Sequence, residues 1–210
     1  MNLEYKYWYF EKGLPSTICN DVIKHALAKK TQNKAGTLSI DARKKLNKKQ
    51  AKDLKKYRNS NIVWLKDQWI FDAIIPFVNT ANKKAGWNFE IDKAETIQFT
   101  IYKKGHYYNY HQDNGKHPYN TPINPDTHGK IRKLSVTVSL NDASEYKGGE
   151  LQFLYHNQKD YTKLKKLKAK EIKRQGSVVV FPSFEFHAIT PVTKGTRYSL
   201  VMWCIGSPFK

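Results

Sequence analysis

The feature that most restricts the fold is a series of short β-type segments in the second half of the chain. From Glu95 onward, runs rich in β-branched and aromatic residues recur, and Gly, Pro, Asn or Asp separates them. This pattern favours short antiparallel strands over helices. The expected strands are 96–102, 107–111, 134–140, 150–155, 177–181 and 198–205.

The first half of the chain has a different pattern. Helical spacing of apolar residues predicts one helix from Pro15-Ser16 to about Lys30 and another from about Lys66 to Ala85. Before them, the aromatic stretch 5–10 suits a short strand. Helices first and strands later indicate an α+β fold, with helices against one face of a β-barrel or sandwich.

The length of 210 residues fits one domain, 1–210. We expect 1–94 to be mainly helical support and 95–206 to form the β core. No apolar run is long enough for a membrane span, and the N-terminal residues show no secretory signal. Cys19 and Cys204 have neither metal-binding nor redox spacing. We therefore expect a cytoplasmic, thiol-reduced protein.

Positive charge is concentrated in two segments. The formal net charge is +19, and segments 29–58 and 156–174 together hold 16 of these excess charges. One interpretation is contact with nucleic acid or another acidic surface. The favoured interpretation is a pair of solvated loops, because the chain has 32 Lys and only 5 Arg, and Arg is the usual reader of bases and phosphates.

A histidine and an aspartate two residues apart are the first sign of a metal site. Residues i and i+2 of a strand point to the same side, so His111 and Asp113 can reach one ion. His187 follows a strand that ends in a Pro turn, and it supplies a third candidate ligand. Two His and one carboxylate on one face of an octahedron leave three positions open, which suits a non-haem Fe(II) oxygenase.

Arg197 and Ser199 share one face of the last predicted strand. A guanidinium beside a hydroxyl suits a carboxylate ligand, because arginine can bind it through two parallel N–H bonds. A surface ion pair is the less favoured alternative, since the strand neighbours of Arg197 are apolar. Three further histidines are expected to be surface residues: His106, His117 and His128.

Several motifs follow one another in the order of a known family. Tyr102-x-x-Gly105-x-x-Tyr108-x-x-His111-x-Asp113 resembles the metal-strand signature of the prolyl 4-hydroxylase-like branch of the 2-oxoglutarate/Fe(II) dioxygenases. Arg58-Asn59-Ser60 and Glu95-Thr96-Ile97-Gln98 resemble its bacterial and phage members of the PKHD type. Further matching motifs are Leu134–Asn141, Gly148-Gly149-Glu150, Phe181-Pro182-Ser183 and Gly195-Thr196-Arg197.

This resemblance implies a double-stranded β-helix (jelly-roll) core with N-terminal helices packed on one sheet. It implies Fe(II) bound by His111, Asp113 and His187. The implied co-substrate is 2-oxoglutarate, bound by a second set of residues, with ascorbate as a further cofactor. The implied reaction is hydroxylation of a proline residue in a peptide or protein. The implied location is the cytoplasm, that of a bacterial host if the chain is phage-encoded. The implied 2-oxoglutarate-binding residues are Arg197, Ser199 and Tyr102.

Three other functions stay open at this stage. They are oxidation of alkylated nucleic acid, oxidation of a free amino acid, and a non-catalytic jelly-roll binding module. The net charge favours nucleic acid, but AlkB-like repair enzymes carry a second arginine shortly after the first, and none follows Arg197. Structural zinc sites usually close with four protein ligands. Only three candidates are found here, which favours catalysis.

Overall fold

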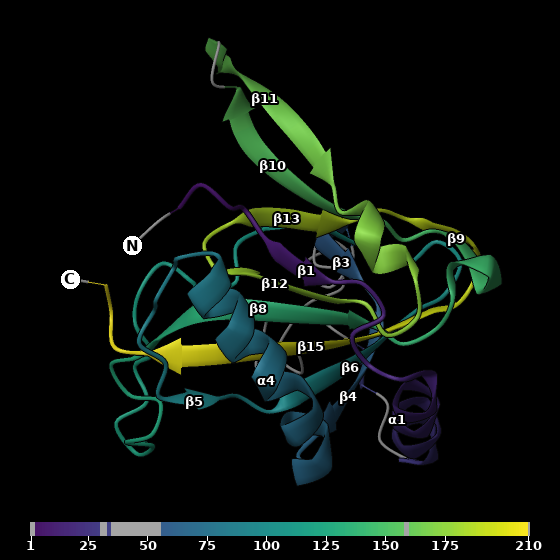
Figure 1. The fold of residues 1–210 in the computed structure, drawn as a ribbon, viewed down its shortest axis with the longest axis horizontal. Helices are drawn as coiled ribbons and strands as arrows, with labels where there is room; N and C mark the ends of the chain where they lie inside the picture. The colour runs from purple at the N-terminus through teal and green to yellow at the C-terminus, as the bar shows by residue number, and fades with distance from the viewer. Residues whose placement is uncertain (1–2, 30–32, 35–55, 158–159, 210) are drawn as a thin grey trace.

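The computed structural model describes residues 3–29, 33–34, 56–157 and 160–209 (Figure 1). Two antiparallel sheets lie face to face, and the two α-helices found in the described ranges pack on the outer face of the larger sheet. Most of the basic segment 29–58 falls outside the described residues, so the expectations for it are not addressed by this structure. Within the described ranges, no helix is long and apolar enough to span a bilayer.

The larger sheet has eight strands, all paired antiparallel along the path β1-β12-β8-β15-β6-β4-β2, with β5 on the side of β15. Their bounds are β1 Trp8–Phe10, β2 Asn33–Lys34, β4 Asn61–Leu65, β5 Lys93–Ala94, β6 Ile97–Tyr102, β8 Ile131–Ser139, β12 Val178–Pro182 and β15 Arg197–Gly206.

The smaller sheet has five strands in the order β11-β10-β13-β7-β3, and a separate two-stranded ribbon pairs β14 with β9. Four strands of the larger sheet (β6, β15, β8 and β12) and four of the smaller sheet (β7, β13, β10 and β11) form the expected jelly roll. The bounds are β3 Arg58–Asn59, β7 Tyr107–His111, β9 Tyr146–Gly148, β10 Leu151–Asn157, β11 Asp160–Lys168, β13 Phe186–Ile189 and β14 Val192–Gly195.

The helices are α1 (Ser16–Ala28) and α4 (Gln68–Lys84), close to their predicted ranges. Each buries one apolar stripe against the larger sheet, which is the arrangement that the helical spacing predicted. Two short 3-10 helices, η1 (Ala143–Glu145) and η2 (Lys170–Lys173), connect later strands. The buried stripe residues are Cys19, Val22 and Ala26 of α1 and Ile70, Ile74, Val78 and Ala81 of α4.

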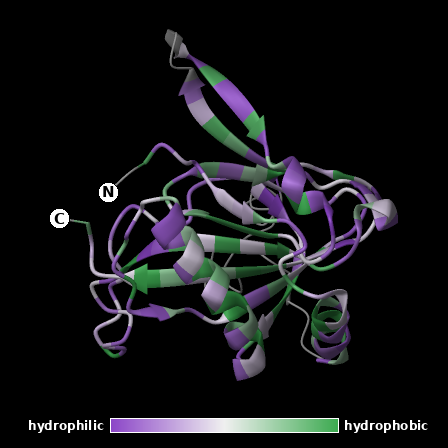
Figure 2. Ribbon diagram, in the orientation of Figure 1, coloured by the Kyte–Doolittle hydropathy of each residue, from purple (hydrophilic) through white to green (hydrophobic). Residues whose placement is uncertain are grey.

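Alternate residues along the strands divide between two cores. Val178 and Val180 of β12 belong to the core beneath the helices. Val179 and Phe181 of the same strand belong to the core between the sheets. The same alternation runs along β8, where hydrophobic residues alternate with more polar ones (Figure 2). The polar inner face of the larger sheet is where the candidate site lies.

The structure corrects the expectation of a loop over segment 156–174. Residues 160–168 form strand β11, which pairs with β10 in a hairpin that extends away from the body of the molecule (Figure 1). Leu167 of β11 packs on the core between the sheets. The high lysine content suggested a solvated loop, but β11 is an edge strand, where lysines are common because they discourage pairing with other chains.

Candidate active site

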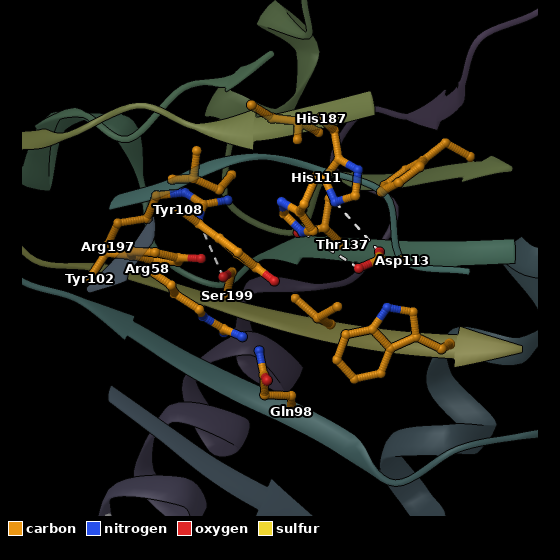
Figure 3. Close-up of a pocket in the computed structure, with 15 residues that line it drawn as sticks. Arg58, Gln98, Tyr102, Tyr108, His111, Asp113, Thr137, His187, Arg197 and Ser199 are labelled. Carbon is orange, nitrogen blue, oxygen red and sulfur yellow. Dashed lines mark hydrogen bonds and ion pairs between the residues drawn. The ribbon is translucent and has the colours of Figure 1, made fainter. Parts of the chain in front are cut away.

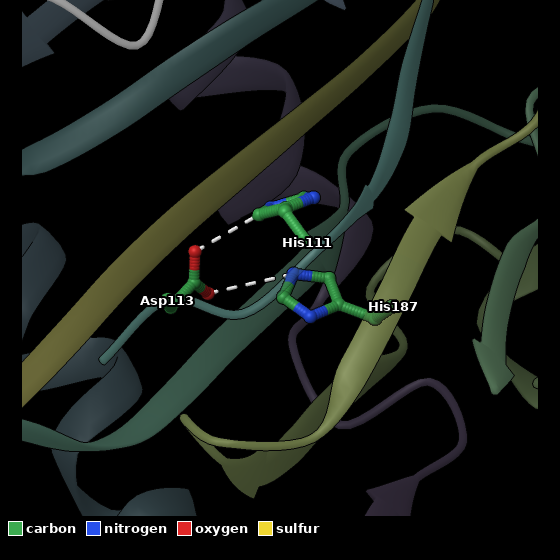
Figure 4. Close-up of side chains that lie close together, drawn as sticks. All are labelled: His111, Asp113 and His187. Atoms are coloured by element: carbon green, nitrogen blue, oxygen red, sulfur yellow. Dashed lines mark ion pairs between the residues drawn. The ribbon is translucent and has the colours of Figure 1, made fainter. Parts of the chain in front are cut away.

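Three side chains from the smaller sheet meet in the space between the sheets (Figure 4). His111 is the last residue of β7, Asp113 follows two residues later, and His187 lies on β13 directly opposite His111. The Nε2 atoms of His111 and His187 are 3.5 and 3.4 Å from the two carboxylate oxygens of Asp113. Metal–ligand bonds of about 2.0–2.2 Å place neighbouring ligand atoms about 3 Å apart, so the cluster has the size of a metal site.

Backbone carbonyls fix the orientation of both imidazoles. Nδ1 of His111 lies 2.8 Å from the carbonyl oxygen of Asn109, and Nδ1 of His187 lies 2.9 Å from that of Glu185. A proton on each Nδ1 satisfies these carbonyls and leaves the Nε2 lone pair directed at the cluster. Burial lowers the pKa of His187 to about 4, so its imidazole is neutral and able to bind a metal near pH 7.

Asp113 is held as a carboxylate. Burial by itself would raise the pKa of Asp113, but His187 and His111 beside it outweigh burial and hold that pKa well below its usual range. The Ser135 hydroxyl donates a 2.8 Å hydrogen bond to Oδ2 of Asp113 and lies 2.9 Å from the Ser183 hydroxyl. This network orients the one anionic group of the cluster, as outer hydrogen bonds do in metal sites.

Arg197 lies in the same cavity, toward the end away from Asp113 (Figure 3). Arg197 is 1% exposed, and its Nη1 donates to the Ser199 hydroxyl at 3.2 Å. Among the described residues, Nε and Nη2 of Arg197 have no hydrogen-bond partner. A buried cation with two unpaired donors is costly by itself. The donor set therefore fits an anionic ligand, and a carboxylate matches its geometry.

A glycine turn holds Arg197 in place. Gly149 has a φ of +62°, a left-handed conformation that favours glycine. A Cβ at this position would lie 2.9 Å from Cδ of Arg197 and 3.0 Å from a methyl of Val192. Glycine at position 149 thus lets the backbone approach the Arg197 side chain closely.

Further residues of the cavity were found by sequence reasoning only in part. Tyr102, a predicted ligand of the co-substrate, pairs with Arg197 in the strand register, with its ring centre 5.5 Å from the guanidinium carbon. Tyr108, which the sequence analysis named only as part of the metal-strand motif, stacks on the His111 ring with ring centres 3.5 Å apart and lines the cavity. The guanidinium of Arg58 lies over the Tyr108 ring, 4.3 Å from the ring centre.

Sequence reasoning did not assign Arg58, Gln98, Thr137 or Trp203 to the site, although all four line the cavity. The only available signal was that Arg58 and Gln98 fall within motifs that resemble PKHD-type proteins. The three histidines expected at the surface stay outside the metal cluster, which contains only residues 111, 113 and 187 within the described part of the chain.

A jelly roll that encloses two histidines, one carboxylate and an arginine with two unpaired nitrogens among the described residues defines a class: non-haem iron oxygenases that use a carboxylate co-substrate. The model of the 2OG-Fe(II) oxygenase superfamily matches residues 97–205. This match covers more than half of the chain. The chain belongs to the 2OG-Fe(II) oxygenase superfamily, whose cofactor and co-substrate are Fe(II) and 2-oxoglutarate.

Curated relatives place the similarity more narrowly. A PKHD-type hydroxylase of Shewanella oneidensis is 37% identical over 108 residues, which cover 50% of this chain and 40% of that protein. A PKHD-type hydroxylase of Xylella fastidiosa (strain M23) is 32% identical over 108 residues, 50% of this chain and 42% of that protein. The matched part thus spans about two fifths of the length of these relatives.

Solved structures share the fold over nearly the whole chain. A prolyl-4-hydroxylase from Pseudomonas putida superposes with a TM-score of 0.64 at 18% identity and covers 96% of this chain and 92% of that one. A prolyl hydroxylase from Trichoplax adhaerens, in complex with a hypoxia-inducible factor peptide fragment, gives a TM-score of 0.67 at 17% identity, covering 96% and 84%. At these identities the similarity establishes the fold, including the expected jelly roll.

Proposed function

We propose that this chain is an Fe(II)- and 2-oxoglutarate-dependent dioxygenase that hydroxylates a peptidyl residue, proline. In this proposal His111, Asp113 and His187 hold the iron. The observation that carries it is the pair of unpartnered guanidinium nitrogens of Arg197 in the cavity that also contains the His–Asp–His cluster. Such a pair suits the far carboxylate of 2-oxoglutarate, with Ser199 beside it.

Each residue of the cluster has a separate task. His111 and His187 offer neutral nitrogen ligands, and Asp113 offers the negative charge that offsets part of the charge of a divalent ion. When bound, Fe(II) activates O2 in a reaction coupled to oxidative decarboxylation of 2-oxoglutarate to succinate and CO2. Tyr102 faces Arg197 and offers a hydroxyl to the same co-substrate.

Aromatic rings limit the access of water to the cluster. Phe181 packs edge-on against the His187 ring at 4.7 Å, and Phe153 lies 5.1 Å from Phe181. Tyr108 covers the His111 ring. A shielded site protects reactive species from side reactions, which is a requirement of oxidation at an unactivated C–H bond.

The choice of peptidyl proline rests on the relatives. Two curated relatives are named PKHD-type hydroxylases, and two structural neighbours are prolyl hydroxylases, one of them with a bound peptide. We place the reaction in a reducing compartment such as the cytoplasm, because the described chain contains two buried free thiols, Cys19 and Cys204.

The test has two stages. Anaerobic addition of 2-oxoglutarate to the Fe(II)-loaded protein should produce a weak visible charge-transfer band, and His187→Ala should abolish it. A library of proline-containing peptides should then show a mass gain of one oxygen atom together with succinate release, with stimulation by ascorbate. Absence of the band in a folded protein would refute the oxygenase assignment. Turnover of methylated oligonucleotides or free amino acids instead of peptides would refute the peptide assignment.

A further inference from the structure

A second hollow adjoins the candidate active site at Trp203 and is lined by residues of the larger sheet, of α4 and of the connection between β7 and β8. It has a volume of about 750 Å³ and shares Trp203 with the cavity of the metal cluster. The strand register connects the two hollows: Val201 of β15 pairs with Gln98 of β6, which pairs with Trp64 of β4. Directly paired residues of antiparallel strands point to the same side. A continuous row of side chains thus leads from the cavity to Trp64. We call this second hollow the Trp64 groove.

One wall of the Trp64 groove is aromatic. Trp64 is 41% exposed, and its ring centre lies 6.4 Å from that of Trp203. Phe71, near the start of α4, lines the same wall. Arg132 stacks on the Trp203 ring at 3.8 Å and pairs with Glu95, which fixes the indole in position. Trp64, the exposed indole beside this fixed ring, is of the residue type that commonly anchors a binding partner.

The opposite wall is polar and is held by ion pairs. The connection between β7 and β8 contributes Asn124 and Thr127 to the groove. Asp126 in this connection pairs with Lys93, and Lys130 pairs with Asp92 at 2.6 Å. The groove is therefore shaped before any ligand binds, with amide and hydroxyl groups facing an aromatic surface.

The junction of the two hollows contains an unpaired donor. Trp203 is 6% exposed, and its indole Nε1 is buried with no hydrogen-bond partner among the described residues. A buried N–H without an acceptor is unfavourable in the free protein. It becomes favourable when a ligand supplies a carbonyl oxygen at the junction.

We propose that the Trp64 groove binds the substrate peptide on one side of the residue that is oxidised, with an apolar side chain against Trp64 and a peptide carbonyl accepting from Trp203. This inference rests on the proposed function. A peptide matches the mixture of an aromatic wall, amide and hydroxyl groups, and an unpaired N–H. A nucleic acid matches it less well, because two of the three groove cations in the described part of the chain, Lys93 and Arg132 but not Lys66, are already paired with carboxylates.

The test uses the proline-containing peptide that the wild-type chain oxidises best in the library. Trp64→Ala should raise the KM for this peptide about tenfold while kcat changes little, and Trp64→Phe should retain most of the affinity. The matched control is Trp69→Ala, since Trp69 is 39% exposed and lies on α4 against His25, away from the groove. This control should leave the KM unchanged.

Truncated peptides identify the part of the substrate that the groove holds. Removal of residues from one end should raise the KM of the wild-type chain, and the same removal should have little further effect in Trp64→Ala. A Trp64→Ala variant with the wild-type KM, or one whose KM responds to truncation as the wild type does, overturns the inference. If the wild type gives the charge-transfer band but oxidises no peptide, the groove inference fails and the oxygenase assignment stands.

Discussion

Replacement of Arg197 by Met should weaken 2-oxoglutarate binding and at the same time stabilise the ligand-free protein. The guanidinium is 1% exposed, and two of its nitrogens have no partner among the described residues. In the free protein it is therefore a buried charge with incomplete compensation, and exchange of buried ionic groups for apolar ones of similar size often stabilises by about 1–4 kcal/mol. Met has a comparable length and no charge to desolvate.

The same replacement should weaken 2-oxoglutarate binding strongly, although it stabilises the ligand-free protein. Loss of one partner of a buried, hydrogen-bonded charge pair costs about 3–5 kcal/mol. At about 1.4 kcal/mol for each factor of ten, the dissociation constant of 2-oxoglutarate should rise by at least about 100-fold. The charge-transfer band at increasing 2-oxoglutarate measures this constant, and urea unfolding without ligand measures the free energy of unfolding.

Arg174→Met is the control for this experiment. Arg174 is exposed and pairs with Glu11 on the surface, so its replacement should change neither the dissociation constant nor the stability by a large amount. If Arg197→Met binds 2-oxoglutarate with a dissociation constant within about threefold of the wild-type value, the change in binding free energy is below about 1.4 kcal/mol. That result would falsify the anchoring role.

Three further outcomes are expected. Ser135→Ala removes the 2.8 Å hydrogen bond to Asp113 and should weaken Fe(II) binding about 10–100-fold in a metal titration, whereas unchanged affinity would show that this bond is dispensable. Gly149→Ala places a Cβ 2.9 Å from Cδ of Arg197 at a φ of +62°, so it should lower the free energy of unfolding by about 1–2 kcal/mol and raise the KM for 2-oxoglutarate; wild-type values for both would contradict the close approach. Fe(II) at 100 times its dissociation constant should stabilise the protein by about 2.7 kcal/mol relative to protein in chelator, and His187→Ala should show no such difference in thermal unfolding.

The sequence predicted the metal cluster because its signal is local. His111 and Asp113 are two residues apart on a strand end, and the strand geometry alone directs them to one side. The convergence of His187 is a different matter, because it depends on the pairing of β13 with β7 across 76 positions of sequence. The sequence offered His187 as a third candidate ligand, and the family resemblance assigned it to the iron; in the structure, the strand register pairs His187 with His111.

The remaining wall of the site could not be predicted in the same way. Arg58 reaches the cavity only because the two-residue strand β3 pairs with β7, and Trp203 lies on a predicted strand whose contacts across the sheets could not be read from the sequence. The two-residue strand β3 and the lysine-rich strand β11 carry no strong strand pattern, since their stability comes from pairing with neighbours and not from their own composition. For the same reason, the strands contributed by residues 58–65 were not anticipated.

The most direct test of the account is a crystal structure of the protein grown anaerobically with Fe(II) and 2-oxoglutarate. The account predicts one ion bound by Nε2 of His111, a carboxylate oxygen of Asp113 and Nε2 of His187, with the far carboxylate of 2-oxoglutarate on Nε and Nη2 of Arg197. An ion held by other residues, or a 2-oxoglutarate carboxylate paired with Arg58 while Arg197 stays unpartnered, would contradict it.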